Sequence, residues 1–165
     1  MKVRLASDIQ PDSIVDGEGI RTVIWFQGCS HHCDECHNPE TWDFAGGFET
    51  DTEDVKKQID ELEYQNGITL SGGDPFFQAE AASILAKYAH EKGYNVWAYT
   101  GFLFEDIIKN DKMKNLLENI DVLIDGKFNK ALKSLECKFR GSTNQRVIDV
   151  KKSLEQDEVV LYYED

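Results

Sequence analysis

Residues 22–38 read Thr-Val-Ile-Trp-Phe-Gln-Gly-Cys-Ser-His-His-Cys-Asp-Glu-Cys-His-Asn, so an apolar run passes directly into a loop with three cysteines. The β-branched and aromatic residues 22–26 predict a buried strand. Cys29, Cys33 and Cys36 follow with the spacing C-x3-C-x2-C, and three thiolates within eight residues can converge on one soft metal centre. An iron–sulfur cubane usually has four thiolate ligands, one for each iron. Three cysteines therefore leave one iron open to bind a reactant.

A disulfide, a zinc site and a group of unligated core thiols are the alternatives to a cluster at these cysteines. A disulfide is disfavoured because no export signal precedes the loop and an odd number of cysteines cannot pair fully. A structural Cys3His zinc site is an open alternative, with His31, His32 or His37 as the fourth ligand. It lacks the second short cysteine segment that many zinc sites use. Unligated core thiols do not fit so polar a loop, and the fourth cysteine, Cys137, is interpreted as an ordinary thiol.

Downstream of this loop, predicted strands alternate with predicted helices. Apolar β-branched runs end in turn residues, and apolar stripes at helical spacing lie between them. Such alternation implies right-handed βαβ crossovers and a parallel sheet. We therefore expect an α/β fold, an incomplete and open (β/α) barrel of mostly parallel strands. The predicted strands cover residues 22–26, 67–71, 95–100 and 120–125, with a short edge strand at 3–9 and late strands at 147–150 and 159–163. One predicted helix begins at residues 50–53, a second covers 78–92, and residues 104–117 contain one or two short helices.

Cysteine, glycine-rich or polar segments follow four of these predicted strands. In a parallel α/β sheet, ligands bind beyond the carboxyl ends of the strands. Glycines remove side chains where the backbone must approach a ligand closely, although a plain tight turn has the same composition. The coincidence of four such segments at one edge of the sheet predicts a single binding site there. Its candidate residues, besides the cysteines, are Gly72, Gly73, Asp74, Thr100, Asp125 and Lys127.

Five separated pieces of the sequence together resemble one enzyme family. A C-x3-C-x2-C loop after a strand is the signature of radical S-adenosylmethionine (SAM) enzymes. The chain as a whole is similar to the activating proteins of anaerobic (class III) ribonucleoside-triphosphate reductases, from Ile14 to Val150. The pieces are Asp16-Gly17-Glu18-Gly19-Ile20-Arg21, the cysteine loop with Asn38 and Thr41-Trp42, Ser71-Gly72-Gly73-Asp74-Pro75, Tyr99-Thr100-Gly101, and Asp125-Gly126-Lys127-Phe128 with Arg140-Gly141-Ser142-Thr143-Asn144-Gln145-Arg146.

This resemblance implies two cofactors, a [4Fe–4S] cluster held by Cys29, Cys33 and Cys36, and SAM bound at its open iron. It also implies that a flavodoxin-like one-electron donor reduces the cluster and that SAM is cleaved to methionine and a 5′-deoxyadenosyl radical. That radical removes a Cα hydrogen from a glycine of the large reductase subunit. Because the cofactors supply the chemistry, no catalytic residue beyond the cluster ligands is expected. A homodimer or a heterotetramer with the reductase is compatible with this function.

Two classes of alternative stay open at this point. One is a different radical SAM enzyme, either an activase of a formate-lyase-type glycyl-radical enzyme or an enzyme that rearranges a small molecule. The other is a Cys3His zinc module that binds a partner and catalyses nothing. Colour separates the two classes, since an iron–sulfur protein purified without oxygen is brown and a zinc protein is colourless.

The resemblance also implies roles for four of the candidate residues. Asp74 accepts hydrogen bonds from the methionine ammonium of SAM, in a turn that often ends in Glu in this superfamily. Asp125 and Lys127 lie against the ribose and carboxylate of SAM, and Thr100 hydrogen-bonds the same ligand. From the residues alone, a surface ion pair accounts equally well for Asp125 and Lys127.

One position departs from the pattern of the superfamily. Glu35 stands where many radical SAM proteins have an aromatic residue before the last cysteine. We therefore expect the backbone around Glu35 and His37, rather than a stacked ring, to pair with the adenine edge. Candidates for orienting a substrate loop or the surroundings of the cluster, with structural salt bridges as the alternative, are Asp16, Arg21, Arg140 and Arg146.

Length and charge restrict the remaining function classes. The 165 residues are expected to form one radical SAM domain, residues 1–165. A formal charge of −13 argues against a nucleic-acid surface, because phosphate binding depends on Lys and Arg. No apolar run is long enough to span a bilayer, and clustered free thiols favour a reducing cytoplasm. We thus expect a cytoplasmic protein with no nucleic-acid or membrane partner.

Overall fold

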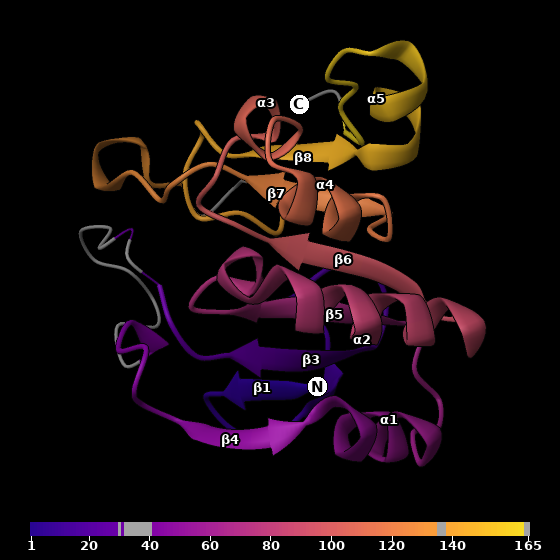
Figure 1. Cartoon of the computed structure of the whole chain (residues 1–165). Coiled ribbons are helices and arrows are strands. Elements are labelled where there is room, and N and C mark those ends of the chain that lie inside the picture. Colours follow the sequence, from indigo (N-terminus) through magenta and orange to yellow (C-terminus); the bar gives the residue numbers. More distant parts are fainter. Residues whose placement is uncertain (30, 32–40, 135–137, 164–165) are drawn as a thin grey trace.

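Eight strands form one sheet, and helices cover one of its faces (Figure 1). The computed structural model describes residues 1–29, 31, 41–134 and 138–163. The strands are β1 Lys2–Leu5, β2 Gln10–Ser13, β3 Arg21–Phe26, β4 Phe48–Asp51, β5 Gly67–Gly72, β6 Asn95–Tyr99, β7 Val122–Asp125 and β8 Arg146–Asp149. The helices are α1 Thr52–Asp60, α2 Ala79–Glu91, α3 Phe104–Ile107, α4 Asp111–Leu117 and α5 Val150–Gln156, with short 3-10 turns η2 Pro75–Gln78 and η3 Lys130–Leu132.

The centre of the sheet is parallel. The strand order is β4-β1-β3-β5-β6-β7-β8, and β2 pairs separately with β3. Strands β3, β5, β6 and β7 run in one direction, while β1 and β2 are antiparallel to β3 and β8 is antiparallel to β7. The expected α/β class with a mostly parallel sheet is therefore confirmed. Because the four central strands point the same way, their carboxyl ends meet at one edge of the sheet.

Local sequence patterns explain the elements that build this centre. The β3 run Arg-Thr-Val-Ile-Trp-Phe is almost fully buried, as its β-branched and aromatic composition predicts. Helix α1 begins after Asp51, whose side chain accepts a hydrogen bond from the N–H of Glu53. Helix α2 buries an alanine-rich face, centred on Leu85, against β5 and β6. The helix face of the sheet thereby forms the main hydrophobic core.

Four elements differ from the sequence-based expectations. The strand expected at residues 3–9 is shorter and is not at an edge, since β1 lies between β4 and β3. Strand β4 was not expected, because its sequence Phe-Glu-Thr-Asp lacks a buried apolar pattern. Strand β2, which contains Pro11, was not expected either. Helix α5 begins at Val150, where the pattern predicted the end of a strand, and residues 159–163 contribute only a bridge between Leu161 and Ile148.

The opposite face of the sheet carries a second, smaller core. Trp97 is at its centre, and the rings of Phe139 and Tyr162 pack edge-on against Trp97. The guanidinium of Arg21 lies 5.3 Å from the centre of the Trp97 ring and donates to the carbonyl of Ile68 at 2.9 Å. Burial of Arg21 lowers its pKa to about 10. Among the described residues, no helix has the length and apolar character needed to cross a membrane.

Candidate functional site

Cys29 lies just beyond the carboxyl end of β3, and its side chain is buried. Its N–H donates to the carbonyl of Trp42 at 3.1 Å, and the N–H of Gly28 donates to the carbonyl of Thr41 at 2.6 Å. The chain that returns from the cysteine loop is thus paired with the segment that enters it. The other expected cluster ligands, Cys33 and Cys36, lie outside the described residues, as do Glu35 and His37.

Gly72 and Gly73 let the end of β5 approach the segment from Phe26 to Gly28 closely. The N–H of Gly73 donates to the carbonyl of Phe26 at 2.9 Å, and the N–H of Asp74 donates to the carbonyl of Gly28 at 3.0 Å. A Cβ on Gly73 would lie 2.6 Å from the carbonyl oxygen of Gly28, which is closer than real Cβ contacts come. The glycines therefore permit contact between two backbone segments of the protein itself. Their contact with a ligand stays a prediction.

Substitution of Gly73 by alanine tests this close approach. The added methyl group meets two backbone oxygens, those of Gly28 and Thr41, which cannot rotate away as a side chain can. We expect the G73A variant to lose about 1–3 kcal/mol of unfolding free energy, the usual cost of overpacking. We also expect it to retain less iron after reconstitution, because the entry to the cysteine loop must shift. Denaturant unfolding and iron analysis measure the two effects.

Gly93 provides a matched control for this substitution. It has a positive φ of +89°, but a Cβ there would meet nothing within 4 Å. The G93A variant therefore bears only the cost of the backbone conformation, about 1 kcal/mol, and should keep its full iron content. Equal iron contents in G73A and G93A would show that the Gly28–Gly73 contact does not support the cysteine loop.

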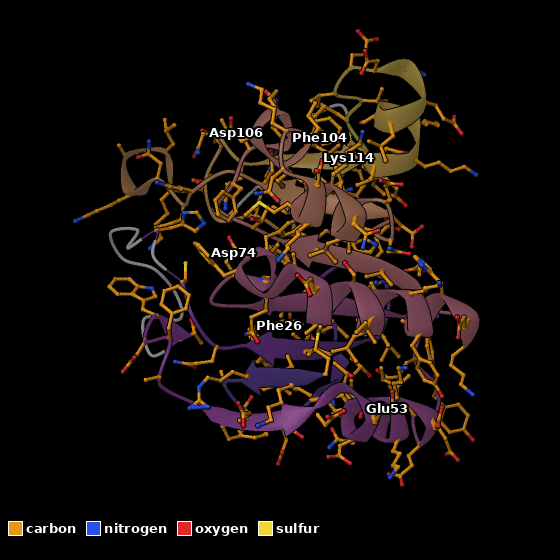
Figure 2. All side chains as sticks on the ribbon, viewed as in Figure 1. Phe26, Glu53, Asp74, Phe104, Asp106 and Lys114 are labelled. Carbon is orange, nitrogen blue, oxygen red and sulfur yellow. The ribbon has the colours of Figure 1, made fainter. Side chains whose placement is uncertain are left out.

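The buried carboxylate of Asp74 joins several strand ends. Its Oδ2 accepts from Thr100 Oγ1 at 2.8 Å and from the N–H of Gly101 at 2.9 Å, and it lies 2.8 Å from Nε2 of His31. Its Oδ1 accepts from the N–H of Phe76 at 2.9 Å, which caps η2. Figure 2 shows Asp74 at the end of the sheet where β3 and β5 stop, with Glu53 at the opposite end. Asp74 and Thr100, two of the expected site residues, are thus in direct contact.

His31 was considered in the sequence only as a zinc ligand, and the structure places it within this network. Its ring packs against the rings of Phe77 and Phe102, with centroid distances of 5.4 and 4.7 Å. A Cβ on Gly101 would lie 2.5 Å from the His31 ring. With its Nε2 against Asp74, His31 ties the start of the cysteine loop to the end of β5.

Asp125, like Asp74, is a buried carboxylate at the end of a strand, in this case β7. Its carboxylate is fully buried and accepts from Arg146 Nε at 3.0 Å, from Arg146 Nη2 at 2.5 Å and from the N–H of Phe104 at 2.8 Å. Nη2 of Arg146 also lies 2.5 Å from Oε1 of the more exposed Glu105. The hydrogen bond to Asp125 raises the pKa of Arg146, and the hydrogen bond from Arg146 lowers the pKa of Glu105. The guanidinium is therefore a permanent cation held between two carboxylates.

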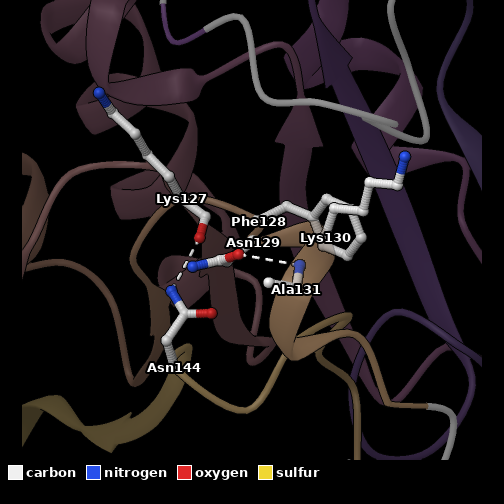
Figure 3. Close-up of a pocket in the computed structure, with 6 residues that line it drawn as sticks. All are labelled: Lys127, Phe128, Asn129, Lys130, Ala131 and Asn144. Carbon is white, nitrogen blue, oxygen red and sulfur yellow. Dashed lines mark hydrogen bonds between the residues drawn. The ribbon is translucent and has the colours of Figure 1, made fainter.

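Lys127, expected to act together with Asp125, makes no ion pair with it. In the described part of the chain, Asp125 pairs with Arg146, and the Lys127 ammonium has no ion-pair partner. Lys127 instead lines an open cavity of about 640 Å³ together with Phe128, Asn129, Lys130, Ala131 and Asn144 (Figure 3). The contacts of Asp125 and Lys127 with SAM stay predictions.

The other polar candidates from the sequence divide into two groups. Arg146 belongs to the site through Asp125. Arg21 lies at the far end of β3, hydrogen-bonded to backbone carbonyls, and the hydroxyl of Thr69 donates to the carbonyl of Asp16 nearby. Arg140 donates to the carbonyl of Gln145 within its own loop. The role of Glu105 was missed, since nothing in the sequence links it to Arg146.

The donor set at this edge suits an iron–sulfur cluster. Cys29 supplies a soft thiol at the end of a buried strand, and its segment is held on both sides by backbone hydrogen bonds. His31, one of the three candidate fourth ligands of the zinc alternative, has its Nε2 against the carboxylate of Asp74. Within the described residues, no group of three His, Cys, Asp or Glu side chains is placed to hold a metal ion.

Comparisons with known proteins agree with this chemistry. A family model described as a 4Fe-4S single cluster domain matches residues 15–148. The chain is 37% identical over 145 residues to an anaerobic ribonucleoside-triphosphate reductase-activating protein of Enterobacteria phage T4, covering 84% of this chain and 90% of that protein. Proteins of the same name are 33% identical in Pasteurella multocida, over 82% of this chain and 90% of the relative, and 35% identical in Salmonella typhimurium, over 83% and 93%.

A solved structure shares the fold. The crystal structure of QueE from Escherichia coli superposes with a TM-score of 0.51 at 16% identity, over 61% of this chain and 53% of that chain. This likeness supports the α/β architecture alone. The match to a 4Fe-4S domain favours an iron–sulfur cluster over the Cys3His zinc module.

Proposed function

Because this chain belongs to the family of anaerobic ribonucleoside-triphosphate reductase-activating proteins, and matches a 4Fe-4S single cluster domain, we propose that it generates the glycyl radical of the large subunit of such a reductase. When bound, the [4Fe–4S] cluster supplies the electron that cleaves SAM to methionine and the hydrogen-abstracting 5′-deoxyadenosyl radical. The observation that carries the proposal is the meeting of Cys29, Asp74, Thr100 and Asp125 at the carboxyl ends of β3, β5, β6 and β7.

The chain's own residues supply position and shielding. Cys29, together with Cys33 and Cys36, would hold the cluster at the end of β3. The buried carboxylate of Asp74, bound to His31, Thr100 and Gly101, fixes the strand ends against one another. It thereby keeps rigid the end of the sheet where we propose that the cofactors bind. The Arg146–Asp125 pair does the same between β7 and β8. We propose that the glycines at 72–73 and the residues Asp74, Thr100, Asp125, Lys127, Glu35 and His37 line the SAM site.

The proposal extends to architecture and partners. We propose that the sheet is the curved wall of an incomplete barrel whose lateral opening admits the glycine loop of the reductase. The protein then works in the cytoplasm, with a flavodoxin-like electron donor, as a homodimer or in a heterotetramer with the reductase. A macromolecular substrate fits an open edge better than a sealed pocket does, because the glycine must enter while still attached to its own protein.

Anaerobic incubation tests this function directly. The reconstituted protein is mixed with SAM and dithionite, with and without the large reductase subunit. We expect 5′-deoxyadenosine in the product analysis and, only with the reductase, a glycyl doublet in the electron paramagnetic resonance spectrum. Formation of 5′-deoxyadenosine without a protein radical would retain the radical SAM chemistry and reject the partner. Absence of both products, with iron and sulfide present, would reject the function.

A further inference from the structure

One segment of this acidic protein is strongly basic. The whole chain has 18 basic and 31 acidic residues, yet residues 127–146 contain six basic residues and one acidic residue. Arg140 and Arg146 are used inside the fold, through Gln145 and Asp125. The other four are lysines with exposed side chains, and Lys138 among them lies 4.8 Å from the centre of the Tyr163 ring. We call the remaining three, Lys127, Lys130 and Lys133, the basic surface. Such a reversal of sign gives this part of the protein a local field opposite to that of the whole.

The basic surface lies beside the start of the cysteine loop. It begins directly after Gly126, whose N–H donates to the carbonyl of Phe102 at 3.1 Å. The ring of Phe102 packs against that of His31, two residues after Cys29. Figure 1 shows η3, which contains Lys130, beyond the carboxyl ends of the central strands, while α5 lies at the other end of the sheet. Positive charge is thus concentrated at the edge where the cluster is proposed.

The arrangement of the lysines favours an extended acidic partner over a single small anion. Figure 3 shows the side chains of Lys127 and Lys130 diverging from each other, so their ammonium groups do not converge on one point. The open cavity that these two lysines line is also lined by Phe128. Leu132 and Leu103, which are 42% and 44% exposed, add apolar area. Basic residues around a small apolar centre are suited to a transient protein interface.

We propose that the basic surface docks an acidic one-electron carrier protein of the flavodoxin class. This inference rests on the proposed function, which requires one electron for each SAM that is cleaved. The carrier is oxidised by one electron and the cluster is reduced by one electron, with no other reactant. A protein of charge −13 repels an acidic carrier over most of its surface. Local positive charge would therefore orient the encounter so that the carrier approaches next to Cys29, where the path for the electron is short.

Charge reversal at two lysines tests the proposal without touching the expected SAM contacts. The variant combines Lys130→Glu with Lys133→Glu. The matched control combines Lys151→Glu with Lys152→Glu on α5, two exposed lysines at the opposite end of the sheet. Both variants change the net charge equally. Each is assayed for 5′-deoxyadenosine formation with reduced flavodoxin and, separately, with dithionite, which needs no docking.

With flavodoxin at low ionic strength, we expect the Lys130/Lys133 variant to be slower by about tenfold or more, the scale of electrostatic steering. We also expect the rate of the unmodified protein to decrease steeply with added salt and the rate of this variant to lose that dependence. With dithionite its rate should be unchanged, and the α5 variant should behave normally with both reductants. Failure of the unmodified protein with dithionite would reject the proposed function, not this docking surface.

Three results would overturn the docking proposal itself. Equal rates of the two variants with flavodoxin would show that the position of the charge is irrelevant. A raised KM of the Lys130/Lys133 variant for SAM, measured with dithionite, would show that these lysines help to bind SAM instead. Normal 5′-deoxyadenosine formation from both reductants, with loss of only the glycyl radical on the reductase, would assign the surface to the large subunit.

Discussion

Replacement of Cys29 by serine is expected to remove the iron–sulfur cluster and, with it, all cleavage of SAM. The loop has only three cysteines, so each must bind one iron, and the fourth iron must stay open. Two thiolates are too few to hold a cubane, and a serine hydroxyl is a harder and far less acidic ligand than a thiol. The loss should exceed the roughly 10–100-fold decrease that follows changes in residues that merely support a metal ligand.

Iron and sulfide analysis of protein prepared without oxygen measures this effect, and 5′-deoxyadenosine formation with dithionite measures its consequence. Cys137→Ser is the matched control, because Cys137 is about a hundred residues from the loop in sequence and has no second cysteine near it. It should keep iron, sulfide and activity. A brown, active C29S variant would show that the cubane is held by other ligands.

Replacement of Arg146 by methionine is expected to lower the unfolding free energy by about 3–5 kcal/mol. Asp125 is fully buried, and two of the three hydrogen bonds to its carboxylate come from the guanidinium of Arg146. Methionine fills part of the space but leaves a buried charge with one backbone N–H as its remaining donor. We also expect weaker SAM binding, because Asp125 lies at the proposed cofactor edge.

Three control variants separate the causes of this loss. Glu105→Gln removes only the exposed partner of Arg146 and should cost less than about 1 kcal/mol. Arg146→Lys keeps the charge but loses the bidentate hydrogen bond to Asp125, so its loss of unfolding free energy should lie between those of E105Q and R146M. Asp125→Asn combined with Arg146→Met removes both charges and should recover part of the stability. If R146M unfolds at the same denaturant concentration as E105Q, the buried ion pair does not stabilise the pairing of β7 with β8.

The elements built by short-range patterns were predictable from the sequence. Residues 22–26, 67–71 and 95–100 match β3, β5 and β6 within a residue or so, and residues 78–92 match α2. Their apolar residues repeat at the strand or helix period within one short window, which is the information such a pattern holds. The same reasoning failed for β4, a polar strand that exists because β1 offers it an unpaired edge.

The placement of the site at the strand ends was also predictable, but the contacts within it were not. Asp74 and Thr100 were each expected at this edge, and the structure joins them at 2.8 Å. Asp125 was expected to act with Lys127, two residues away, whereas its partner is Arg146 on the neighbouring strand. Side chains two residues apart at the end of a strand point to opposite sides of a turn as easily as to the same side, so proximity in sequence does not decide such a pair.

By itself, the sequence determined the ligand chemistry of this protein, its succession of strands and helices, and the edge where its polar residues gather. These properties depend on residue type and spacing over a few positions. Only the tertiary structure decided that Arg146 neutralises Asp125, that His31 joins the Asp74 network, and that the basic surface lies beside Cys29. Those contacts join residues from different strands and loops. They follow from the order and register of the strands, which no local pattern encodes.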